Sequence, residues 1–117
     1  SFYICFFLHL YISNDRFNGI KENKMFNPDV MTDTINPRGY KANYDFEKYI
    51  LSVVKNEISY GASGGFYEIC IFENDNMIEL PGITDEGDAV KGWLTVDDVN
   101  SIIKKLTTIT GVDAKLL

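Results

Sequence analysis

Apolar residues recur every three to four positions between Asn43 and Gly61, and charged residues fill the gaps. This spacing is typical of one face of an amphipathic helix. Asn43 or Asp45 is suited to cap the start of such a helix, and Gly61 to end it. The pattern therefore predicts a helix in this segment, with a buried stripe formed by Phe46, Tyr49, Ile50, Val53, Val54 and Ile58.

The following segment has the composition of β-strands. Residues 66–72 are mainly β-branched and aromatic, and residues 73–76 are turn formers that lead into a second apolar run at 77–80. These features predict a β-hairpin. The glycine-rich stretch 61–65 precedes a strand, whereas glycine loops that bind phosphate follow a strand, so we interpret it as a connector.

A third strand and a second helix are predicted near the C-terminal end. Residues 90–94 form a short apolar run, and Thr95 with Asp98 three positions later resembles a capping box. Leu94 is placed to pack against Val99 as a hydrophobic staple. Gly111 is a natural C-cap residue, and the buried stripe of this helix is predicted to be Val99, Ile102, Ile103 and Leu106.

The predicted order is α-β-β-β-α. We therefore expect an α+β fold in which two amphipathic helices cover one face of a small antiparallel sheet of about three strands. Residues 43–117 would form this single domain. Residues 25–42 carry Pro28, Pro37 and Gly39, and the segment 36–39 suits a type I turn, so we expect an arm or linker there.

Residues 1–24 read differently from the rest of the chain. Phe2 to Ile12 is an almost unbroken apolar run, too short to span a bilayer and without the cationic leader of a secretory signal. Lys21-Glu22 can be encoded as a purine-rich ribosome-binding tract ahead of Met25. We therefore expect Met25 to be the natural start and 1–24 to be a non-native extension; if the segment is native, its simplest role is an added strand.

Candidate catalytic residues are few. His9 is the single histidine and lies in the suspect segment, and Cys5 and Cys70 sit in apolar runs, which favours reduced, buried thiols in a cytoplasmic protein. No nucleotide motif is present, and the acidic loops lack the spacing of a calcium loop. We therefore predict a protein that is not an enzyme and has neither a cofactor nor a metal.

Charge is segregated along the chain, whose formal net charge is −6. Between Gly61 and Asn100, Lys91 is the single base among nine acids. Such a region attracts basic proteins and repels phosphate, so we expect neither direct nucleic-acid binding nor a membrane partner. The alternative is that these acids only keep a small domain in solution.

These observations favour a small acidic protein that binds and inhibits or neutralises a basic partner, such as a nuclease or another nucleic-acid-binding protein. Phage anti-defence and immunity proteins act in this way, some by nucleic-acid mimicry. The alternative is an assembly subunit, for instance of a virion, that self-associates through its sheet edge or its tyrosine-rich arm. We expect Trp93 to complete the core. The predicted partner-binding residues are Glu73, Asp75, Asp85, Glu86, Asp88, Tyr40 and Tyr44.

Overall fold

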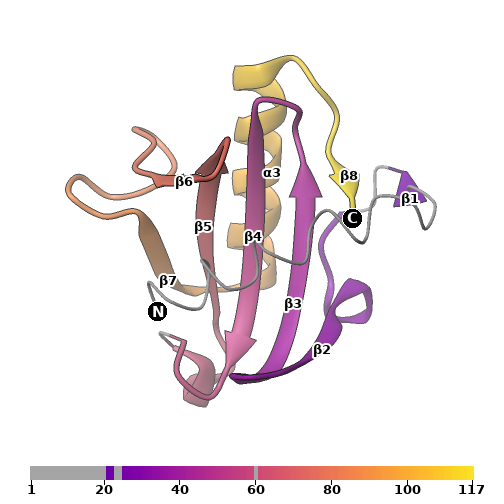
Figure 1. Ribbon diagram of the computed structural model, residues 1–117, viewed down its shortest axis with the longest axis vertical. Coiled ribbons are helices and arrows are strands. Elements are labelled where there is room, and N and C mark those ends of the chain that lie inside the picture. Colours follow the sequence, from indigo (N-terminus) through magenta and orange to yellow (C-terminus); the bar gives the residue numbers. More distant parts are fainter. Residues whose placement is uncertain (1–20, 23–24, 60) are drawn as a thin grey trace.

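The computed structural model describes residues 21–22, 25–59 and 61–117, and these form an antiparallel sheet with helix α3 against one face (Figure 1). Two single-turn 3-10 helices, η1 (Pro28–Val30) and η2 (Ala62–Gly64), lie in the connections. The larger elements, in chain order, are β1 (Lys21–Glu22), β2 (Thr32–Ile35), β3 (Arg38–Asp45), β4 (Tyr49–Asn56), β5 (Tyr67–Glu73), β6 (Asn76–Ile78), β7 (Val90–Leu94), α3 (Val96–Thr110) and β8 (Lys115–Leu116).

The sheet is built around the long strands β3, β4 and β5. Its order is β1-β8-β3-β4-β5-β6, with β2 also paired to β3, and β7 also paired to β5. In the central register, Tyr44 lies opposite Leu51, and Leu51 lies opposite Ile71. Because directly paired residues share a face, these three side chains lie in one row across the sheet.

The main core lies between the sheet and α3. Tyr44, Leu51 and Ile71 on the sheet and Val99 and Leu106 on the helix are fully buried in one cluster. The opposite face of the central strands is also buried, and a smaller cluster of Ile50, Cys70 and Phe72 lies there. The central strands are therefore apolar on both faces.

Helix α3 matches its prediction closely. Thr95 Oγ1 accepts a hydrogen bond from the Asp98 N–H at 3.1 Å, and the Asp98 carboxylate accepts one from the Thr95 N–H at 3.0 Å. These bonds complete the capping box and lower the pKa of Asp98. Gly111 ends the helix with φ 71°, and the predicted stripe of Val99, Ile102, Ile103 and Leu106 is the buried one.

The predicted three-strand sheet with two helices is wrong. The segment between Asn43 and Gly61 is not a helix: it contains the end of β3 and the whole of β4. Every residue of β4 except Lys55 is buried, so apolar residues occupy consecutive positions and imitate helical spacing. Ile50, Val53 and Val54 are β-branched, which favours the extended backbone.

The segment 25–42 is not a separate arm: residues 32–35 and 38–42 lie in strands of the sheet, and the part before them packs on the core. Phe26 is 1% exposed, and its N–H and C=O both form hydrogen bonds with the side chain of Asn100 on α3. β2 and β3 pair from Thr32–Lys41 to Ile35–Arg38, so the turn at Asn36–Pro37, whose peptide bond is cis, joins two strands. This hairpin carries the first half of the long strand β3.

The remaining strand predictions are confirmed. β5 and β6 form the expected hairpin, with Glu73 opposite Asn76, and β7 has the predicted bounds. The predictions for the N-terminal segment fall almost wholly on residues 1–20 and 23–24, which lie outside the described residues. Lys21 and Glu22 do lie in the described part and pair with β8 as β1.

Candidate functional site

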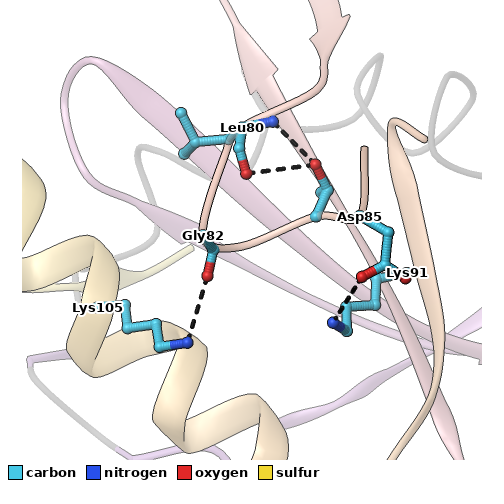
Figure 2. Close-up of polar contacts among 6 residues, drawn as sticks. Leu80, Gly82, Asp85, Lys91 and Lys105 are labelled. Carbon is cyan, nitrogen blue, oxygen red and sulfur yellow. Dashed lines mark hydrogen bonds and ion pairs between the residues drawn. The ribbon is translucent and has the colours of Figure 1, made fainter. Parts of the chain in front are cut away.

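The acidic loop after β6, residues 79–89, is anchored to the body of the protein. Ile83 is 3% exposed and belongs to the main core, and the neighbouring Thr84 is also buried. The Leu80 N–H donates to Thr84 Oγ1 at 2.9 Å, and this hydroxyl donates back to the Leu80 carbonyl at 3.3 Å (Figure 2). The loop is therefore a packed element with a defined path.

Two further hydrogen bonds hold the same loop, one to α3 and one between its two ends. Lys105 on α3 donates from Nζ to the Gly82 carbonyl at 3.3 Å, as Figure 2 shows. Glu79 Oε2 accepts a hydrogen bond from the Gly87 N–H at 2.7 Å, which closes the loop across eight residues. Because a buried isoleucine and side-chain hydrogen bonds hold the loop, its backbone follows a defined path, and the acidic residues project from defined positions on it.

Five predicted site residues lie in two successive connections of the chain, the β5–β6 turn and the loop that follows β6. Glu73 and Asp75 lie at the hairpin turn, and β6 and the loop that follows it lie on the side of β5 away from β3 (Figure 1). All but Glu73, which is half-buried, are exposed. We name this surface the acidic edge: Glu73, Asp75, Asp85, Glu86 and Asp88.

Lysines partly offset the acidic edge. Lys48 Nζ lies 3.8 Å from the Glu73 carboxylate, and Lys91 Nζ lies 3.2 Å from that of Asp85. The Asp85 side chain in the second pair remains 70% exposed, and exposed pairs of this kind contribute little to stability. Among the described residues, Glu86 and Asp88 form no ion pair. The surface thus stays electronegative and accessible.

The side chains of the acidic edge are carboxylates, which suit the binding of positively charged groups. Within the described part of the chain, no three histidine, cysteine or acidic side chains converge as metal ligands. Exposed carboxylates that do not converge on one point bind the cationic groups of a partner one by one, through electrostatic attraction and hydrogen bonds.

The structure separates the two predicted tyrosines. Tyr44 is fully buried on the face of β3 that packs against α3, so its side chain is withdrawn from any partner. Burial also raises the pKa of Tyr44. Tyr40 is 51% exposed, but it pairs with Lys55 near the far end of β4, whereas Glu73 pairs with Tyr49 at the start of β4. Six residues of strand separate them, about 20 Å, so Tyr40 is not part of the acidic edge.

Cys70 differs from its predicted state. Its side chain is fully buried on β5, and the residue is disulfide-bonded, so it is not the reduced thiol that its apolar surroundings suggested. Glu68, two residues earlier, is also fully buried. The face of β5 that holds these residues is therefore buried.

Trp93 also differs from its prediction as a core residue. The indole is 64% exposed and leans on Phe66, with ring centroids 5.9 Å apart. Trp93 has φ 60°, a left-handed backbone conformation that is uncommon outside glycine and costs on the order of 1–3 kcal/mol. Its place just before the helix cap gave no sequence signal of this exposure.

Sequence reasoning missed a second surface at the β2–β3 hairpin. A groove of about 670 Å³ lies there, and Ile35, Arg38, Tyr40 and Lys55 are among the residues that line it. Ile35 is 92% exposed. The available signal is an isoleucine directly before an Asn-Pro turn, but the sequence predicts no common face for these side chains until β2 is paired with β3.

Comparison of the chain with protein families, with curated proteins and with solved structures gives no match in any of the three. In the part of the chain that the structure describes, no helix is both long enough and apolar enough to cross a membrane. Function is therefore inferred from the geometry and charge of the two surfaces.

Proposed function

We propose that this protein binds a basic protein through the acidic edge and inhibits or neutralises it. What supports the proposal is the anchoring of the 79–89 loop: Ile83 is buried in the core, and Glu79, Thr84 and Lys105 hold the loop by hydrogen bonds. Acids that only confer solubility need no such anchoring. A fixed array of carboxylates loses little conformational freedom when it binds.

The sign of the charge selects the class of partner. An electronegative surface speeds the approach of a basic protein and repels the phosphates of nucleic acids and of anionic membranes. Nucleases and other nucleic-acid-binding proteins carry positive grooves that accept spaced anions. A rigid set of carboxylates competes for such a groove, which would make the protein a nucleic-acid mimic of the anti-defence or immunity kind.

The test compares two variants of equal net charge. The first neutralises the acidic edge by Glu73→Gln, Asp75→Asn, Asp85→Asn, Glu86→Gln and Asp88→Asn. The matched control neutralises five exposed acids elsewhere: Asp29→Asn, Glu47→Gln, Glu57→Gln, Asp97→Asn and Asp113→Asn. Both sets change the formal net charge from −6 to −1. Each protein is immobilised and exposed to lysate, and the retained proteins are identified by mass spectrometry.

We expect the wild type and the control variant to retain the same basic protein, and the acidic-edge variant to lose it. Retention should weaken as salt rises toward physiological strength, where the Debye length is about 8 Å, because the attracting charges are exposed. Equal retention by the acidic-edge variant, or retention that is indifferent to salt, would refute the proposal. Thermal unfolding of the variants checks that the fold is retained.

A further inference from the structure

β2 is an edge strand that is open to a further strand. Among the described residues it pairs only with β3, and the antiparallel register runs without a bulge from Thr32 to Ile35. Every second residue of such a strand directs its N–H and C=O away from its neighbour. β2 contains neither proline nor lysine, two common means of blocking an exposed edge.

An apolar surface adjoins this edge. Ile35 and Tyr40, which are 92% and 51% exposed, both line the groove beside β2. Asp33 pairs with Tyr40, Tyr40 pairs with Lys55, and Ile35 pairs with Arg38, so all these side chains share the face of the sheet that packs against α3 farther along. Exposed isoleucine and tyrosine on one face beside an open edge are typical of an interface.

The charge of this surface identifies the occupant. Arg38 and Lys55 balance Asp33 and Glu57, and within the described part of the chain none of the four forms an ion pair. A surface that carries equal numbers of positive and negative charges is not selective for a strongly basic or a strongly acidic partner. It is self-complementary, which is what a two-fold symmetric interface requires, since the same residues face one another in both copies.

We infer that the protein forms a dimer in which β2 pairs antiparallel with β2 of a second copy. We place Thr34 opposite Thr34 of the second copy, so that Asp33 lies opposite Ile35 of the second copy. The α3 helices of both copies then lie on the same face of the combined sheet. This register also keeps the two Asp33 carboxylates apart. Arg38 of the second copy is then two strand spacings from Asp33, about 10 Å between backbones, which an arginine side chain spans.

The test measures the mass of the full chain by sedimentation velocity from about 1 μM to about 100 μM. The wild type should approach twice 13.3 kDa as concentration rises. Ile35→Glu should raise the dimer dissociation constant about tenfold or more, because each new carboxylate would lie directly opposite Asp33 of the second copy. Ile109→Glu is the matched control: Ile109 is 52% exposed on α3, and this variant should dimerise as the wild type does.

A charge exchange tests the register. Asp33→Lys should weaken the dimer by placing two cations together, and Asp33→Lys combined with Arg38→Glu should restore part of the affinity. Thermal unfolding of each variant confirms that the fold persists. A wild type that stays monomeric throughout the range, or equal effects of Ile35→Glu and Ile109→Glu, would overturn the inference. Failure of the double variant to recover affinity would overturn the proposed register.

Discussion

Replacing Tyr44 by Phe should stabilise the protein. The Tyr44 ring is fully buried between β3 and α3, and its hydroxyl has no hydrogen-bond partner among the residues that the structure describes. Folding therefore strips water from the hydroxyl without returning a hydrogen bond, which costs about 1–3 kcal/mol. Phenylalanine keeps the packing of the ring and removes this cost.

The expected gain is about 1–3 kcal/mol in the free energy of unfolding at pH 7. For a chain of this length, 1 kcal/mol corresponds to about 4 °C in Tm, so thermal unfolding should resolve the change. Tyr40→Phe is the matched control. Because Tyr40 is half-exposed and its hydroxyl is hydrated in both states, that variant should stay within about 0.5 kcal/mol of the wild type.

The same variant should alter the response to alkali. Burial raises the pKa of Tyr44 above its ordinary value of 10.0, so the folded protein holds this proton after the unfolded chain has lost it. Stability is therefore lost as pH rises above about 10. Tyr44→Phe should reduce this loss, and part should remain because burial also raises the pKa of Tyr67. Destabilisation by 1 kcal/mol or more at pH 7 would show that the hydroxyl has a partner and refute the reasoning.

Three further predictions concern the helix and Trp93, two residues before its cap. Ile103→Ala should lower the free energy of unfolding by about 2–5 kcal/mol, because Ile103 is buried. Thr95→Ala should lower it by about 1 kcal/mol through loss of the helix cap. Equal, small changes of both variants in urea unfolding would contradict this. The pKa of Asp98 is lowered from 3.8, so its carboxylate stabilises the fold above about pH 4, and this stabilisation is lost as the pH falls through the pKa of the folded protein. Asp98→Asn should therefore reduce the fall in Tm at acid pH. Curves of Tm against pH that run parallel for the variant and the wild type would contradict this. Trp93→Gly should be at least as stable as Trp93→Ala in thermal unfolding, because φ is 60°, and a less stable glycine variant would show that the conformation is not strained.

The elements predicted from local signals were found where expected. The capping box of Thr95 and Asp98, the apolar stripe and Gly111 all act within one helix, so the sequence alone determines α3. The sequence of β4 resembles that of a helix because its signal depends on the rest of the sheet. A strand buried on both faces has no alternation, and the pairs Ile50-Leu51 and Val53-Val54 then fit helical spacing equally well.

The candidate site was predictable only in part, for a related reason. Acidic residues in turns and loops lie at the surface whatever path the loop takes, so the carboxylates of the acidic edge could be predicted from the sequence. The tyrosines could not, because exposure on a strand depends on register and on what covers each face. Tyr40 and Tyr44 lie on the same face of β3, and α3 covers only one of them. Ile35 and Arg38 became a surface only once β2 was known to pair with β3.

The two surfaces lie near opposite ends of β4, and this separation makes their roles independently testable. Pairing through β2 would leave both acidic edges of a dimer exposed, so the dimer would offer two binding sites to one surface. On a sensor densely coated with the basic partner, both sites bind together and dissociation slows through the high effective concentration. Ile35→Glu should then speed dissociation from a dense coating and leave the affinity measured in dilute solution unchanged. Neutralising the acidic edge should abolish binding in both formats without changing the sedimented mass. Equal loss of dilute-solution affinity in both variants would instead mean that the partner contacts the β2 surface directly.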